Sequence, residues 1–177
     1  TSVLEPFYQM YFISGAPGIF SLQSQAWAER FGIPAEKIRE AATRLSLDHH
    51  NDAFDNPYAH IKQRLTEEQI NTARVITYPI RLWDVCPNSD GACAMIMASE
   101  KMAKKLTRKP AWVKGIGYAG DEYWYGDSDK VNWQTAIQAS KQAYDMAGIK
   151  NPRKELDVAE VYNPFTYQEM LFYECFG

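Results

Sequence analysis

Residues 86–100 (CPNSDGACAMIMASE) constrain the fold more than any other part of this chain. The segment 87–91 is a run of turn-forming residues, and Gly91 at its end permits a positive φ and a close approach by another group. The segment 92–98 is an unbroken run of small and apolar residues, which is typical of a strand buried on both faces. Ser99 is then placed to cap a helix. A turn, a buried strand and a helix in this order predict an α/β protein.

Two signals recur along the rest of the chain: caps followed by amphipathic stripes predict helices, and short β-branched or apolar runs predict strands. The predicted helices cover residues 19–31, 34–49, 66–73, 131–147 and 166–177. The other predicted strands cover residues 75–78, 80–85, 111–118 and 156–162. Residues 14–18, 51–59 and 121–129 are predicted loops.

Local motifs sharpen the helix predictions. Residues 66–69 (TEEQ) and 166–169 (TYQE) both have the form of a capping box, in which the first and fourth residues bond each other's backbone. Asp129 is placed to cap the helix after it, and Gly148 to end that helix. The final helix is apolar on nearly every side, so we expect it to lie between two layers.

Composition excludes several classes of protein. A net charge of −3 and a pI of about 5.6 leave no basic face for nucleic acid. No apolar run approaches the roughly 20 residues of a membrane span. The three cysteines form neither a disulfide framework nor a zinc pattern, which indicates a reducing cytoplasm. His49, His50 and His60 have no carboxylate or cysteine at ligand spacing, so we predict structural hydrogen bonds and no metal site.

Three stretches resemble the thiolase superfamily. Residues 90–94 (DGACA), the apolar run after them and residues 98–101 (ASEK) resemble the motif that closes the N-terminal half of these proteins. Residues 157–169 resemble the strand, loop and helix that carry the NEAF box of ordinary thiolases or the HDCF box of the sterol-carrier-protein-type branch. Residues 50–59 and 79–82 resemble that second branch in particular. The resemblance covers about residues 27–177 and implies part of the layered αβαβα thiolase fold.

The same resemblance implies a division of the chain. Residues 1–78 would be a mostly helical segment of the loop domain that covers the coenzyme A site. Residues 79–107 would be the last strand and helix of the N-terminal half, and residues 108–177 the start of the C-terminal half. The nucleophilic cysteine of the family would lie upstream and its GHP and CxG loops downstream. We therefore expect an internal piece of a larger protein, or one part of a split one, that does not catalyse alone and needs the remainder of the thiolase chain.

The resemblance also implies ligands and partners. Coenzyme A would be a substrate or product, with no permanently bound cofactor. The superfamily dimerises, which predicts a homodimer, and this branch often works with a small OB-fold/zinc-ribbon protein. No nucleic acid or membrane span is expected.

Matching residues 162–165 (YNPF) to the family box assigns candidate site residues. Tyr162 stands where the family has an asparagine or histidine that stabilises the substrate enolate oxygen. Its hydroxyl can donate that hydrogen bond. The Asn163 amide is an alternative donor, and a further alternative places the Tyr162 ring in the core. The other residues expected at the substrate and coenzyme A site are Cys86 (near the pantetheine arm), Asp90, Gly91 and Phe165.

Three functions stay open at this level. The first is an acyl-CoA enzyme that forms or cleaves a carbon–carbon bond beside a thioester. Tyr162 also suits a thiolase-like retro-aldolase acting on a β-hydroxyacyl-CoA, which needs no cysteine nucleophile, and a third alternative is a non-catalytic scaffold subunit. Cys93 and Cys175 are expected to pack in the interior. The aromatic loop 121–129 would shape an acyl pocket or form a buried loop or subunit contact.

Overall fold

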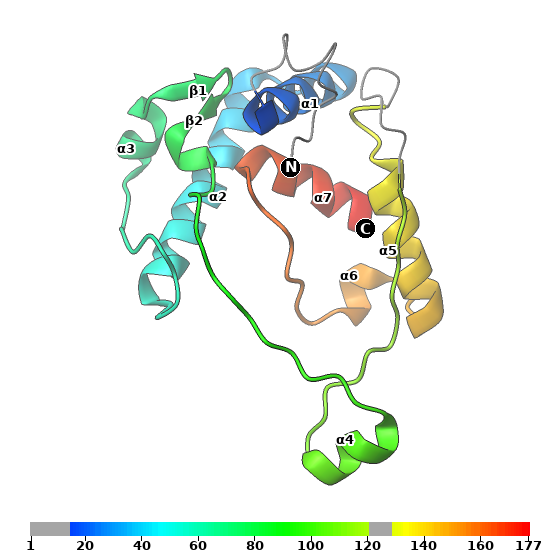
Figure 1. Cartoon of the computed structure of the whole chain (residues 1–177). Coiled ribbons are helices and arrows are strands. Elements are labelled where there is room, and N and C mark those ends of the chain that lie inside the picture. Colours follow the sequence, from blue (N-terminus) through cyan, green and yellow to red (C-terminus); the bar gives the residue numbers. More distant parts are fainter. Residues whose placement is uncertain (1–14, 121–128) are drawn as a thin grey trace.

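A computed structural model describes residues 15–120 and 129–177 (Figure 1). Residues 1–14 and most of the predicted loop 121–129 lie outside the described residues. In chain order the elements are α1 (Gly15–Phe31), α2 (Ala35–Asp55), α3 (Glu67–Thr72), β1 (Val75–Thr77), β2 (Ile80–Arg81), the 3-10 helix η1 (Leu82–Asp84), α4 (Glu100–Leu106), α5 (Gln134–Ala147), α6 (Pro152–Glu155) and α7 (Thr166–Phe176).

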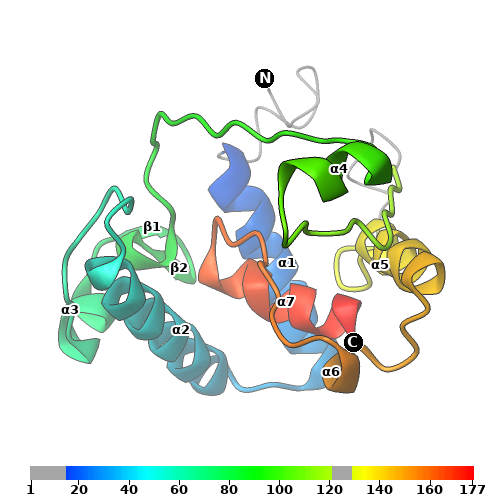
Figure 2. The same ribbon diagram turned by 90° about the horizontal axis from the view of Figure 1, so that it is seen from below.

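The helix α7 lies at the centre of the molecule, with α1, α2 and α5 packed around it (Figure 2). Its first turn and Leu171 are buried, as expected for a helix that is apolar on most sides. The buried cluster around it consists of Trp27, Ile38, Ala42, Ile80, Val131, Phe165, Tyr167 and Leu171. The first half of α7 is buried as expected, but Tyr173 in its second half is 48% exposed, and the placement of this helix between two layers stays a prediction.

A buried ion pair joins α2 to the segment that follows the hairpin. Arg39 donates from both terminal nitrogens to the Asp84 carboxylate, at 2.6 and 2.8 Å. Asp84 also accepts from the backbone N–H of Arg81 at 2.8 Å, and Arg39 reaches the Tyr167 hydroxyl at 3.3 Å. Bidentate hydrogen bonding of this kind fixes the relative orientation of the two side chains as well as pairing their charges. It locks α2, η1 and α7 to one another.

The β1–β2 hairpin and the segment after it bring the chain to the start of α7. β1 and β2 pair antiparallel, with Thr77 opposite Ile80. After η1, Val85 forms an isolated antiparallel bridge with Phe165, and the Cys86 N–H donates to the Pro164 carbonyl at 2.9 Å. The strand pattern predicted for residues 80–85 is thus shortened, because the chain turns through η1 to reach the start of α7.

The observed helix ends match the predicted ones where the capping groups are close together in the sequence. The capping box at Thr66 is confirmed, since Gln69 N donates to Thr66 Oγ1 at 3.2 Å and Thr66 N to Gln69 Oε1 at 2.9 Å. Gly148 ends α5 with φ +77°, the left-handed conformation expected there. Asp129 accepts from Val131 N at 2.9 Å, but it caps a turn before the helix, which begins only at Gln134.

Other helix ends differ from the predictions. α1 begins at Gly15, so the predicted turn at residues 14–18 is mostly helical, and α2 continues to Asp55, through the start of the predicted loop. The capping box predicted at Thr166 is wrong. Phe165 occupies the N-cap position, and no side-chain bond caps α7. Glu169, the fourth residue of that motif, is drawn instead into the buried contacts described below.

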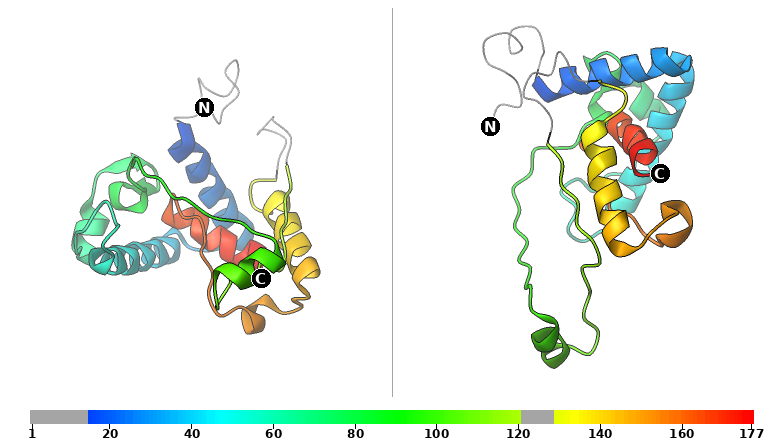
Figure 3. Two further views of the ribbon diagram at one scale, coloured as in Figure 1. Left: turned by 60° about the horizontal axis from the view of Figure 1, so that its bottom comes forward. Right: turned by 90° about the vertical axis from the view of Figure 1, so that its right-hand side faces the viewer.

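Three predicted strands lie outside any sheet in the described residues. Residues 92–98, 111–118 and 156–162, called here the three extended segments, run as extended chain. The first two lead to and from α4, which lies apart from the other helices (Figure 3, right). Met95, Ile96 and Met97 are 82%, 89% and 79% exposed, so the predicted burial of the first segment is wrong in this structure. A strand needs neighbouring backbone groups to complete its hydrogen bonds, and the described residues supply none here.

One extended segment packs on α5 through its glycines. A Cβ at Gly115 would lie 2.1 Å from the Ala143 carbonyl oxygen, and one at Gly117 would lie 1.7 Å from that of Ala139. Only glycine allows so close an approach between backbones. The alternate residues face outward, with Ile116 69% and Tyr118 84% exposed. This segment therefore keeps the two-residue period of a strand with one face covered.

The expected division at residues 78/79 and 107/108 stays a prediction, and the β1–β2 hairpin crosses its first boundary. No helix in the described ranges is long and apolar enough to cross a membrane.

Candidate functional site

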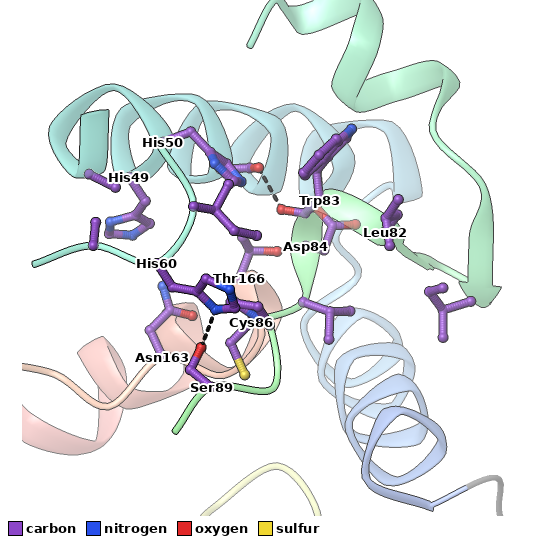
Figure 4. A pocket seen from close by; sticks show the side chains of 17 residues that line it. His49, His50, His60, Leu82, Trp83, Asp84, Cys86, Ser89, Asn163 and Thr166 are labelled. Atoms are coloured by element: carbon purple, nitrogen blue, oxygen red, sulfur yellow. Dashed lines mark hydrogen bonds between the residues drawn. The ribbon is translucent and has the colours of Figure 1, made fainter. Parts of the chain in front are cut away.

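A cavity of about 710 Å³ opens between α2, η1 and the start of α7 (Figure 4). Most of its wall is apolar, as in small-molecule sites generally. The apolar lining residues include Ala53, Ala59, Ile61, Ile76, Leu82 and Val85. The polar lining residues are Ser46, His49, His50, His60, Asp84, Cys86, Ser89, Asn163 and Thr166.

Two of the residues predicted for the site line this cavity together. Cys86 follows η1 and Asn163 precedes α7, and the Val85–Phe165 bridge brings these two segments side by side. Each residue comes from a different sequence motif. The structure therefore brings two residues expected at the site to the lining of one cavity.

The other predicted site residues lie elsewhere. Tyr162 is 73% exposed, so its ring is not in the core, and it does not line the cavity. Asp90 and Gly91 are exposed and do not line it either, and Gly91 does not adopt a positive φ. Phe165 is only 5% exposed and packs in the core, with its ring centroid 4.7 Å from that of Phe20. Phe165 therefore anchors the start of α7 in the core.

Glu169 gathers a group of hydrogen bonds that sequence reasoning missed. The residue is 3% exposed, and its carboxylate accepts from Asn163 Nδ2 and from the Tyr173 hydroxyl. His49 Nε2 lies 2.7 Å from Glu169 Oε2. A buried carboxylate needs such donors, so a glutamate in the first turn of an apolar helix is the signal that points to them.

Burial sets the protonation of the groups near this carboxylate. Burial, together with the hydrogen bond and the charge of Glu169, raises the pKa of Tyr173 to about 12, so this phenol stays protonated and donates. Burial, with a smaller contribution from the neighbouring His49, lowers the pKa of His50. The His50 ring instead packs edge-on against Trp83, with centroids 5.3 Å apart.

Two further polar groups border the cavity. His60 Nδ1 lies 2.6 Å from Ser89 Oγ at its exposed rim (Figure 4). Thr166 is buried, and its hydroxyl has no hydrogen-bond partner among the described residues. A buried hydroxyl without a partner costs free energy, and this oxygen is closed to solvent beneath the cavity wall. Within the described ranges, no group of three or more His, Cys, Asp and Glu side chains is arranged to hold a metal ion.

The cysteines differ in exposure. Cys86 and Cys93 are both exposed, which makes the expected packing of Cys93 wrong in this structure, because the segment that carries it is uncovered. Cys175 is half-buried, and burial raises the pKa of its thiol, which suits a packing role.

Known proteins resemble the chain along most of its length. No family model matches it. Benzoylsuccinyl-CoA thiolase subunit BbsB of Thauera aromatica is 29% identical over 90% of this chain and 40% of its own length. An acetyl-CoA acetyltransferase of Methanothermobacter thermautotrophicus is 28% identical over 91% of this chain and 41% of its own. Sterol carrier protein 2 of Bos taurus is 25% identical over 92% of this chain and 30% of its own.

A solved structure shares the fold. An Ltp2-ChsH2(DUF35) aldolase covers 98% of this chain, with a TM-score of 0.76 and 21% sequence identity, and the match spans 44% of the aldolase chain. The predicted resemblance to the thiolase superfamily and the α/β fold class are therefore confirmed. The chain spans about two fifths of the length of the thiolase and acetyltransferase relatives.

Proposed function

We propose that this chain supplies part of the site of a thiolase-superfamily enzyme that forms or cleaves a carbon–carbon bond beside a coenzyme A thioester. One observation carries the proposal: Cys86 and Asn163, two residues that the family resemblance leads us to expect at the site, line the same apolar-walled cavity. The thiolase and acetyltransferase relatives support it. Coenzyme A enters as substrate or product.

The cavity suits the two ends of an acyl thioester. Its apolar wall offers a surface for the acyl group, while Asn163 lies in its lining just before α7. Asn163 uses one N–H for Glu169 and has a second N–H left to donate. Cleavage of the carbon–carbon bond leaves an enolate oxygen, and fixed donors stabilise that developing charge. Cys86 would lie beside the thiol arm of coenzyme A.

A retro-aldolase is the second candidate, favoured by one sequence observation and one structural likeness. Residues 162–163 are Tyr-Asn, where the family boxes carry an asparagine or histidine, and the shared fold is that of an aldolase. That aldolase is named as a pair, Ltp2 with ChsH2(DUF35). A homodimer, a small OB-fold/zinc-ribbon partner and a cytoplasmic location are proposed with it. Tyr162, Asp90 and Gly91 would then act at the site only if their exposed segments are covered by further protein.

Two assays on the purified protein, together with any polypeptide that copurifies, test the proposal. One follows cleavage of a β-hydroxyacyl-CoA, and the other follows thiolysis of a β-ketoacyl-CoA by free coenzyme A. Turnover in either assay supports the proposal, and the substrate that reacts separates aldolase from thiolase. Binding of both thioesters without turnover would favour the scaffold subunit and contradict an enzyme.

Asn163→Ala then tests the named residue. Loss of a fixed donor to an enolate lowers kcat roughly 10²- to 10³-fold. Gln138→Ala is the matched control, since this exposed amide lies on α5 away from the cavity and its loss leaves kcat unchanged. Equal kcat for Asn163→Ala and the control would remove Asn163 from the mechanism.

A further inference from the structure

His49 has the surroundings of a proton-transfer residue. Its side chain is 45% exposed and lines the cavity, and its Nε2 lies 2.7 Å from Glu169 Oε2. Because a carboxylate oxygen accepts, Nε2 carries the hydrogen in this bond. Nδ1 is then the nitrogen left to exchange a proton with a ligand, and it has no hydrogen-bond partner in the described ranges.

Glu169 holds this histidine in place. The carboxylate accepts from the Asn163 amide and the Tyr173 hydroxyl as well as from His49, and it is 3% exposed. A buried carboxylate with several donors has little freedom to turn, so it fixes both the tautomer and the plane of the imidazole. The same carboxylate orients Asn163. One buried group therefore positions two side chains that face the cavity.

We propose that His49 is the general base and acid of the proposed reaction and that Glu169 is its positioning residue; this inference rests on the proposed function. With a β-hydroxyacyl thioester, His49 Nδ1 takes the hydroxyl proton, and the O–H electron pair forms the new C=O bond. The Cα–Cβ bond breaks, and its electron pair passes into the thioester as an enolate held by the Asn163 amide. His49 returns the proton to Cα, which releases the shorter acyl thioester and leaves the imidazole neutral.

The test measures kcat and KM for β-hydroxyacyl-CoA cleavage with the protein and its copurifying chains. His49→Ala is expected to lower kcat roughly 10²- to 10⁴-fold with KM unchanged, and added imidazole is expected to restore part of the rate. Glu169→Gln is expected to lower kcat without affecting KM, and imidazole is not expected to rescue it. Tyr173→Phe removes one donor and keeps the carboxylate, which covers the case in which Glu169→Gln fails to fold. Lys37→Ala, exposed on the same helix α2, controls for substitution in that helix.

The outcomes separate the inference from the function it rests on. Loss of kcat in His49→Ala with imidazole rescue supports the inference. Wild-type kcat in His49→Ala overturns it while the proposed function stands. Turnover of the β-ketoacyl-CoA alone also overturns the hydroxyl step and leaves the proposed function intact, and no turnover of either thioester overturns both. Wild-type kcat in both Glu169→Gln and Tyr173→Phe removes the positioning role.

Discussion

Two regions of the molecule carry equally clear sequence patterns and reach opposite states. In the helical body, made of α1, α2, α7, the β1–β2 hairpin and η1, apolar stripes are buried and ionic groups are paired. In the three extended segments, runs that are just as apolar remain exposed, with Ile96 at 89% and Val158 at 81%.

The difference lies in which residues complete the backbone hydrogen bonds of a helix and of a strand. A helix completes its backbone bonds within one segment, so a good sequence is enough to form it when a neighbour covers one face. A strand depends on a second strand for the same bonds. The helical body therefore completes its backbone hydrogen bonds internally, while the three extended segments have the composition of interior strands and no neighbouring strand among the described residues.

The largest expected effect is on the ion pair that locks the body. Asp84→Ala leaves the Arg39 charge largely buried without its partner and is expected to lower the free energy of unfolding by about 4 kcal/mol. The matched control is Asp55→Ala, because Asp55 is 75% exposed and pairs with Arg64 at 3.4 Å; we expect a change below about 0.5 kcal/mol. Urea denaturation measures both, and similar values would mean that Asp84 is hydrated in solution.

A pair of isoleucines compares the two regions directly. Ile80 is fully buried beneath α7, and Ile80→Ala is expected to lower the free energy of unfolding by about 3 kcal/mol through the cavity it leaves. Ile96→Ala removes the same atoms from an exposed site and is expected to change it by less than about 0.5 kcal/mol. Urea denaturation compares them. A large loss from Ile96→Ala would show that residues 92–98 are covered in solution.

Glycine packing on α5 should give an intermediate effect. Gly117→Ala places a methyl group against the Ala139 carbonyl and is expected to cost about 2 kcal/mol, with faster hydrogen exchange at the Tyr118 amide that donates to Gln142. Gly91→Ala is the control, since a Cβ there meets nothing within 4 Å. If both variants exchange alike at Tyr118, the segment does not rest on α5.

The smallest expected effect is a fall in the free energy of unfolding of the helical body at alkaline pH. Burial raises the pKa of Tyr167 from 10.0 to about 12. Its contribution to stability is therefore complete below pH 10 and is lost as the pH rises toward about 12, because the unfolded phenol ionises first. The free energy of unfolding should fall less steeply over this range in Tyr167→Phe than in the wild type. Equal slopes of the free energy of unfolding against pH in the two proteins would mean that the Tyr167 hydroxyl is exposed to water.

Local signals predicted the fold well where their partners were also local. The Thr66 box formed with both of its hydrogen bonds, each between residues of the same motif. The Thr166 box has the same pattern and did not form, because Glu169 lies in the interior and takes donors from three side chains. A four-residue motif cannot show that competition, since His49 comes from another helix.

Sequence reasoning likewise predicted one part of the candidate site and missed another. The meeting of Cys86 and Asn163 follows from motifs that the sequence displays. The His49–Glu169 pair carries no pattern, because it joins residues 120 positions apart through the packing of α2 on α7. The roles expected for Tyr162, Asp90 and Gly91 belong to segments that are exposed in this structure, and they stay predictions.

Thiol labelling tests the central claim most directly, because it reads the cavity without requiring turnover. Cys86 lines the cavity, while Cys93 is equally exposed and does not line it. Iodoacetamide labelling, resolved residue by residue by mass spectrometry, is run with and without a β-hydroxyacyl-CoA. We predict that the thioester slows labelling of Cys86 and leaves Cys93 unchanged. Equal labelling of Cys86 in both samples would contradict an acyl-CoA site in this cavity.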